Sequence, residues 1–113
     1  MNGTVDLVIA GDGNAARAAS VSALRRGQRV LVVLGCADVR VARRLRRILV
    51  RTAGADGGQL RVITSGLVVC VDGVTGVEAV VIRHAATGRL SAVNASAFIS
   101  CDGQKNEYDA RPD

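Results

Sequence analysis

The residues best suited to do chemistry in this sequence are the glycines near its start. Residues 11–16 read GDGNAA, which fits the pattern G-x-G-x-x-A and directly follows a short apolar run. In this pattern the first glycine allows a tight turn, the second lets a phosphate approach the backbone, and the small last residue brings a helix close to a strand. N–H groups at the start of that helix then face the negative charge. The pattern predicts a pyrophosphate site at Gly11, Gly13, Asn14, Ala15 and Ala16.

A second set of candidates follows the next apolar run, where the ribose of a dinucleotide would lie. Many dinucleotide-binding domains carry Asp or Glu at the end of the second strand to bind the ribose hydroxyls. Here residues 34–38 read LGCAD, so no acid stands at the strand end. Asp38 could reach the ribose, but we favour for it a role as helix N-cap. Arg40 could bind the 2′-phosphate of NADP, although a solvated helix face explains the surrounding arginines equally well.

Three more residues are expected at the same edge of the sheet. Asp102 and Gly103 follow the last apolar segment, and ligands of open α/β sheets bind at the carboxyl ends of the strands. Cys36 is expected near this cleft as a buried or half-buried, inert thiol. We assign no catalytic residue, because the sequence places no acid, base or nucleophile beside a substrate pocket. We assign no metal site either, because no two of the three cysteines form a C-x-x-C pair.

The first half of the chain reads as alternating strands and helices that position these residues. Apolar runs predict buried strands at Val5–Ala10 and Arg29–Leu34. Between them an alanine-rich helix is predicted over Asn14–Arg26, ending at a glycine. A second helix, with apolar residues on one face and arginines on the other, is predicted from Asp38 to about Ala53. The order indicates a βαβ unit with a right-handed crossover.

The second half of the chain has the character of a β-structure. Short apolar runs bounded by Gly, Asp and Thr predict five strands. The third and fourth of these are joined through the turn at residues 86–88 as a hairpin. The predicted strands are Leu60–Thr64, Leu67–Val71, Val77–Arg83, Arg89–Val93 and Ala97–Cys101.

Length and composition are those of one small α/β domain. The chain has 113 residues, of which 49% are hydrophobic and 2% aromatic, so Val, Ile, Leu and Ala must fill a single core. We expect a dinucleotide-binding domain over residues 1–103 and a polar tail over 104–113. The predicted class is α/β: a Rossmann-like three-layer domain, with a parallel sheet covered by two helices on one side and a three-stranded β-meander on the other.

Charge and cysteine content indicate which partners and which cellular compartment to expect. Six of the 15 basic residues are arginines between positions 40 and 51, and the other nine nearly balance ten acidic residues. Because the positive charge is local and aromatic residues are scarce, nucleic acid is not an expected partner. An odd number of cysteines, a polar start and the lack of a long apolar run predict a cytoplasmic protein without a membrane span.

Beyond single motifs, the chain resembles the nucleotide-binding domain of FAD-dependent pyridine nucleotide-disulfide oxidoreductases, the thioredoxin reductase-like family. The likeness runs from Val5 to Gly103 and is carried by residues 11–16, 29–33, 60–64, 69–77, 86–88 and 97–99. It implies an oxidoreductase module that binds a nicotinamide or flavin dinucleotide, with Arg40 at a position that contacts the 2′-phosphate in NADPH users. Here Gly35-Cys36 replaces the basic pair after the second strand, and the redox C-x-x-C is missing.

These observations lead to two functional hypotheses. The first is a dinucleotide-binding module of the flavin-linked type, for NADP or NAD with FAD as the alternative, which needs a partner flavoprotein chain or a further domain for catalysis. The second is a non-catalytic remnant of such a domain that acts in dimerisation or protein interaction. A domain isolated from its parent exposes apolar surface, and this favours a homodimer in either case.

Overall fold

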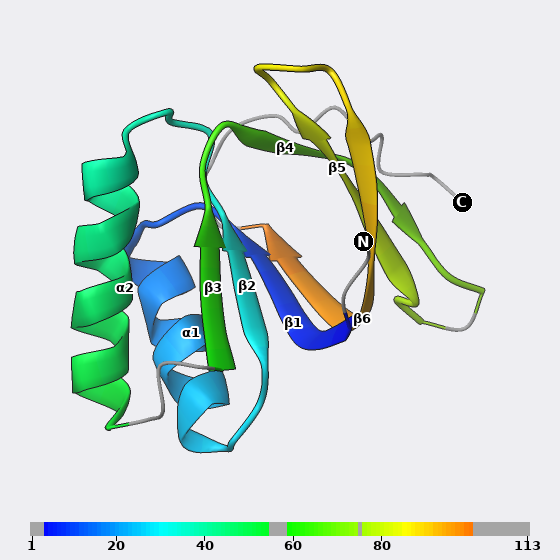
Figure 1. Ribbon diagram of the computed structural model, residues 1–113. Helices are drawn as coiled ribbons and strands as arrows, with labels where there is room; N and C mark the ends of the chain where they lie inside the picture. Colours follow the sequence, from blue (N-terminus) through cyan, green and yellow to red (C-terminus); the bar gives the residue numbers. More distant parts are fainter. Residues whose placement is uncertain (1–3, 55–58, 75, 101–113) are drawn as a thin grey trace.

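The computed structural model describes residues 4–54, 59–74 and 76–100, and within them a sheet covered by two helices (Figure 1). Strands and helices follow the apolar runs expected from the sequence, and most bounds lie within one or two residues of the predicted ones. In chain order the elements are β1 (Thr4–Ala10), α1 (Asn14–Arg25), β2 (Val30–Val33), α2 (Val39–Ala53), β3 (Leu60–Ile63), β4 (Gly66–Asp72), β5 (Ala79–His84) and β6 (Leu90–Ser100).

The strands form one sheet in the order β3-β2-β1-β6-β5-β4. β1, β2 and β3 run parallel, and β6 joins them in parallel beside β1. Beyond this point β6, β5 and β4 pair antiparallel, which is the predicted meander. The carboxyl ends of β1 and β2 therefore meet at one edge of the sheet, where Gly11 donates its N–H to the carbonyl of Val33 at 3.0 Å.

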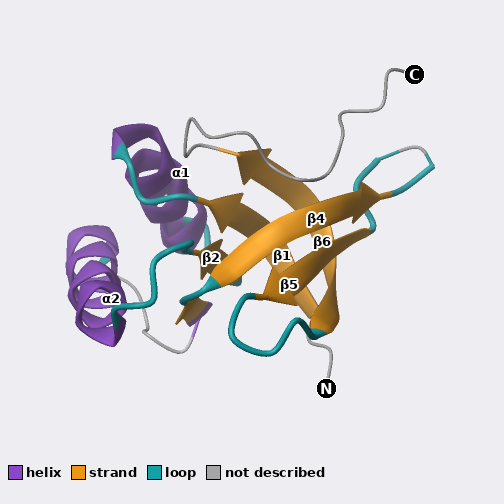
Figure 2. Cartoon of the chain, turned by 90° about the horizontal axis from the view of Figure 1, so that it is seen from above, coloured by secondary structure: helices purple, strands orange, loops and turns teal. Residues whose placement is uncertain are grey.

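The sheet lies between two apolar clusters, because neighbouring residues of a strand point to opposite faces. On β1, Leu7 and Ile9 pack with α1 and α2, whereas Val8 and Ala10 pack with residues of β4, β5 and β6. Figure 2 shows the two helices on one side of β1 and β2 and the meander strands on the other. Burial on both faces explains why these parallel strands are continuous apolar runs. The predicted three-layer α/β fold is confirmed.

One prediction about the strands is wrong. Arg89–Val93 and Ala97–Cys101 were expected as two strands, but residues 90–100 form the single strand β6. Asn94 pairs with Ala79 of β5 on one side and with Thr4 of β1 on the other. The polar residues at 94 and 96 resemble a break in the sequence, yet their side chains are exposed while their backbone continues between β1 and β5. The end predicted at residue 101 lies outside the described residues.

The passage from β3 into β4 requires a very close approach of backbone to side chain. A Cβ atom added at Gly66 would lie 2.9 Å from Cγ1 of Val33 and 3.3 Å from Cγ2 of Ile82. Gly66 also donates its N–H to the carbonyl of Leu34 at 3.0 Å. Ser65 precedes it with a φ of 55°, a left-handed conformation that is uncommon outside glycine. This corner fixes the meander against the end of β2.

Candidate functional site

The corner between β1 and α1 has the shape that the glycine pattern predicts. β1 ends at Ala10 and α1 begins at Asn14. Gly11 has a φ of 112°, a conformation that side chains with a Cβ rarely adopt, so the turn requires glycine here. Gly13 is the N-cap residue of α1 in an extended conformation, and no side chain caps the helix. The N-terminus of α1 therefore presents its backbone without a capping side chain from Gly13.

The first turn of α1 presents unpaired donors. Among the described residues, no hydrogen-bond acceptor faces the N–H groups of Asn14, Ala15 and Ala16. The first turn contains no acidic residue, and the side chains of Asn14 and Ala15 are exposed. Ala16 is only 1% exposed and packs into the core between α1 and the sheet. Unpaired amides at a helix N-terminus with no acid in its first turn form a local site for an anion, although the exposed Asp12 directly precedes the N-cap residue.

Arg17 is a residue of this corner that the sequence reasoning did not single out. Its Nε donates to the backbone carbonyl of Asp12 at 3.0 Å. This bond holds a guanidinium beside the glycine turn and adds a positive charge where an anion would bind. The signal in the sequence was an arginine directly after the G-x-G-x-x-A pattern.

At the end of β2, Asp38 caps α2, as favoured from the sequence. Its Oδ1 accepts the backbone N–H of Arg40 at 2.9 Å. The guanidinium of Arg40 also bonds to the carboxylate, with Nε 3.2 Å from Oδ1. This guanidinium, and then the backbone N–H of Arg40, hold the pKa of Asp38 below its usual value. Asp38, the candidate for binding the ribose, and Arg40, the candidate for binding the 2′-phosphate, therefore pair with each other. The side chain of Arg40 nevertheless remains 86% exposed.

Cys36 corrects one expectation, and two other candidates lie outside the described residues. Cys36 is exposed rather than buried or half-buried, because it sits in the loop after β2, where its carbonyl accepts the N–H of Ser65 at 2.7 Å. Ser100, the last residue of β6, pairs with Ala10 at the end of β1. Asp102 and Gly103 follow it and lie outside the described residues, so their place at the site stays a prediction.

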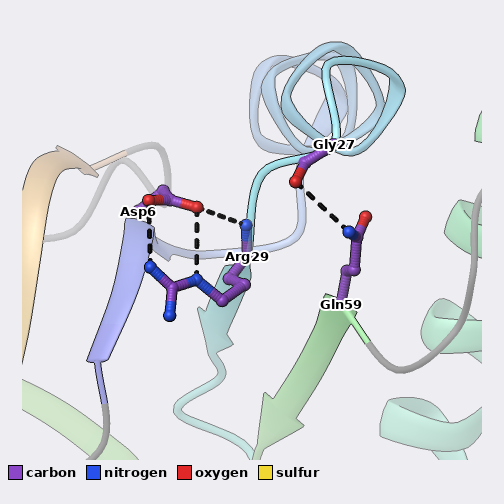
Figure 3. Close-up of polar contacts among 4 residues, drawn as sticks. All are labelled: Asp6, Gly27, Arg29 and Gln59. Atoms are coloured by element: carbon purple, nitrogen blue, oxygen red, sulfur yellow. Dashed lines mark hydrogen bonds and ion pairs between the residues drawn. The ribbon is translucent and has the colours of Figure 1, made fainter.

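At the amino-terminal ends of β1 and β2, opposite the candidate site, an ion pair holds the two strands in register (Figure 3). The carboxylate of Asp6 accepts the backbone N–H of Arg29 at 2.7 Å and lies 3.4 Å from its guanidinium. These contacts, the backbone bond first, lower the pKa of Asp6. Beside them, Gln59 donates to the carbonyl of Gly27 at 3.2 Å and ties β3 to the end of α1. Sequence reasoning missed the pair because its members are 23 residues apart.

The described part of the chain shows neither a cluster of metal ligands nor a helix that could cross a membrane. Within residues 4–54, 59–74 and 76–100, no three His, Cys, Asp or Glu side chains come together in a way that could hold a metal ion. Neither described helix is long and apolar enough to cross a membrane.

Comparisons with known proteins show which solved structures share this fold. No protein-family model and no curated protein sequence matches the chain. Among solved structures, thioredoxin reductase from Streptococcus pyogenes MGAS5005 superposes with a TM-score of 0.65 at 21% identity, covering 90% of this chain and 32% of the reductase. The myxobacterial FAD-dependent halogenase CndH gives a TM-score of 0.67 at 12% identity, covering 93% of this chain and 38% of the halogenase.

A third structure, the flavin-dependent monooxygenase PieE in complex with FAD and substrate, gives a TM-score of 0.67 at 14% identity, covering 92% of this chain and 31% of the monooxygenase. The chain thus spans about a third of the length of these enzymes. At such identities the likeness establishes the fold, which is the Rossmann-type fold found in these flavin-dependent oxidoreductases.

Proposed function

We propose that this chain is a dinucleotide-binding module of a flavin-linked oxidoreductase, and that the corner between β1 and α1 holds the pyrophosphate of its ligand. The observation that carries the proposal is that the N–H groups of Asn14, Ala15 and Ala16 have no acceptor among the described residues, at a helix N-terminus without acids in its first turn. Gly13 leaves this backbone uncapped, so a diphosphate can take the place that a capping side chain usually fills.

The residues around the corner suit a pyrophosphate. Gly11 supplies the turn, Gly13 the bare backbone, and Arg17 a nearby positive charge. Asp12 exposes its side chain, and its backbone carbonyl is engaged by Arg17. Because a carboxylate repels a diphosphate, the proposal requires the exposed side chain of Asp12 to point into solvent. The fold supports this placement as well, because open α/β sheets bind ligands at the carboxyl ends of their strands.

The choice between the dinucleotides depends on the loop after β2. No acid stands at the end of β2 to accept the ribose hydroxyls, which favours a ligand whose ribose carries a 2′-phosphate. Arg40 is exposed and reaches solvent, so it can exchange the carboxylate of Asp38 for a phosphate. NADP is therefore the first candidate and NAD the second. FAD is the alternative, supported by the matched halogenase and monooxygenase.

Catalysis by this chain alone is not proposed. A bound dinucleotide supplies hydride or electron transfer, and the protein binds and orients it. The described residues at the corner provide backbone amides and arginines but no acid or base placed beside a substrate. The matched enzymes are about three times longer than this chain. We therefore propose that a partner flavoprotein chain or a further domain completes the enzyme.

Thermal unfolding with NADPH, NADH and FAD as separate ligands tests the proposal. A ligand at 100 times its dissociation constant stabilises the fold by about 2.7 kcal/mol, so the best of the three raises the melting temperature clearly. Gly13→Asp removes this shift, because a carboxylate then faces the pyrophosphate. Gly76→Asp is the matched control, since Gly76 lies in the exposed loop between β4 and β5 and an added Cβ meets nothing within 4 Å. If no ligand raises the melting temperature, the alternative of a non-catalytic remnant acting in protein interaction replaces this proposal.

A further inference from the structure

The outer surface of the helical layer contains a groove that the nucleotide corner does not use. It lies between α1 and α2 and has a volume of about 630 Å³. Its floor consists of Ala18 and Val21 from α1 and of Ile48 and Leu49 from α2. Leu49 is buried, but Ile48 is 38% exposed and Ala18 is exposed as well. The groove therefore leaves apolar surface in contact with water.

Arginines border this apolar floor. Arg25 and Arg26 line the groove at the end of α1, and Arg17 lines it near the start. Arg25 donates to the carbonyl of Thr52 at 3.0 Å and closes one end of the groove, while Arg26 bonds to neutral side chains. In the described part of the chain none of the three forms an ion pair with a carboxylate. Neither helix contains an acidic residue, so the positive charge around the groove is uncompensated by the described residues.

We infer that this groove binds an acidic amphipathic helix of a partner protein. Ala18, Val21 and Arg25 follow one another at helical spacing along α1, and Ile48 and Thr52 do so along α2. These two rows of side chains leave the groove between them, and a row of side chains on a third helix can pack into it. A helix with apolar residues on one face and carboxylates beside them matches both the floor and the arginines.

Other occupants match only part of the surface. A second copy of the same face would bring like charges together, because a two-fold contact pairs a patch with itself. A nucleic acid would pair with the arginines but would leave the apolar floor uncovered, and neither helix carries an aromatic residue on which a base could stack. Of these three occupants, the acidic amphipathic helix alone matches both the floor and the charge.

Binding of a designed peptide to the full chain tests the inference. The probe is a fluorescent peptide of about 18 residues, with leucines at positions i, i+3, i+4 and i+7, a few glutamates beside them and alanines elsewhere to favour the helix. A scrambled peptide of the same composition and a single-stranded oligonucleotide are the comparison probes. Fluorescence anisotropy without nucleotide is expected to show that the amphipathic peptide binds at least about tenfold tighter than the scrambled one.

Variants locate the binding site. Ala18→Glu places a carboxylate on the floor without harming the helix, since Ala18 is exposed and Glu is a good helix former. It is expected to weaken peptide binding at least about tenfold, or about 1.4 kcal/mol. Ala86→Glu, the same substitution in the exposed turn between β5 and β6, is expected to change binding by less than about twofold. Circular dichroism checks that both variants are folded.

Charge on the rim is tested in the same way. Arg26→Gln removes a charge at the groove, and Arg43→Gln removes one from the outer face of α2, outside the groove. The inference predicts that only Arg26→Gln weakens binding. It is overturned if the scrambled peptide binds equally well, if Ala18→Glu and Ala86→Glu have equal effects, or if the oligonucleotide binds tighter than the peptide and Arg43→Gln weakens it.

Discussion

Replacing Gly66 by alanine tests the tightest contact between the layers. The new Cβ would lie 2.9 Å from Cγ1 of Val33, 3.3 Å from Cγ2 of Ile82 and 3.5 Å from Cδ1 of Ile63. Carbon atoms pack best at about 3.5–4.0 Å, so the methyl group must displace Val33 or shift β4. Val33 and Ile82 are branched at Cβ and are 3% and 1% exposed, which leaves them little room to move.

The expected loss follows from two opposing effects. Overpacking of a tight core costs about 1–3 kcal/mol. Alanine also restricts the unfolded chain relative to glycine, which offsets about 0.4–1 kcal/mol. With central values of about 2 and 0.7 kcal/mol for these two effects, the free energy of unfolding should fall by about 1.3 kcal/mol. For a chain of 113 residues the melting temperature should then fall by about 5–8 °C.

Chemical denaturation of wild type, Gly66→Ala, Val33→Ala and the double variant measures the effect and its origin. Removing Cγ1 of Val33 opens the space that the new methyl needs, so the double variant should lose less stability than the sum of the single losses. Gly35→Ala is the control, because its added Cβ meets nothing within 4 Å and its φ is not left-handed. Equal stability of wild type and Gly66→Ala, or strict additivity with Val33→Ala, would refute the reasoning from this contact.

Three other predictions concern the turn between β3 and β4, the ion pair of Asp6 with Arg29, and the arginine after β2. Ser65→Val should destabilise the fold by about 1–2 kcal/mol in denaturant titrations whereas Ser65→Gly should not, because a φ of 55° excludes β-branched residues. Asp6 has a pKa lowered below 3.8 by Arg29, so its contribution is present above that pH and is lost as the pH falls through the folded pKa. Denaturation curves of wild type and Asp6→Asn should therefore differ near neutral pH and converge in acid, and a constant difference would contradict the ion pair. Arg40→Gln should weaken NADPH binding at least about tenfold and leave NADH binding nearly unchanged in calorimetry, and equal losses for both would exclude contact with the 2′-phosphate.

The local elements were predictable because their signals are local. Apolar runs of four to seven residues, separated by glycines, mark β1, β2, β3 and β4, and the alternation of core residues on Leu7 and Val8 explains why the runs are continuous. The cap at Asp38 was predictable for the same reason, since its partner is the backbone of Arg40 two residues later. The glycine turn at residue 11 was predictable as well, because its pattern involves only neighbouring residues.

What the sequence did not indicate depends on distant contacts. β6 was predicted as two separate strands, and only the pairing of Asn94 with both Thr4 and Ala79 shows that the strand continues. The exposure of Cys36 follows from the loop that Ser65 holds, almost 30 residues away in the chain. The groove between α1 and α2 arises from the packing of two helices, so neither helix alone predicts it.

The pairing of β1 with β2 links the candidate site to the core. Asp6 fixes Arg29 at one end of the pair, and Gly11 donates to Val33 at the other. A slip of one residue would exchange the faces of Leu7 and Val8, so that each would enter the cluster in which the other now packs. The same slip would move the glycine turn away from the end of β2. The same register positions the core residues and the glycine turn, so a substitution that removes nucleotide binding by shifting the register must also lower stability. Gly13→Asp instead acts on the exposed corner and should spare the fold. Loss of binding with an unchanged melting temperature of the free protein is therefore the signature of a site at the backbone of α1.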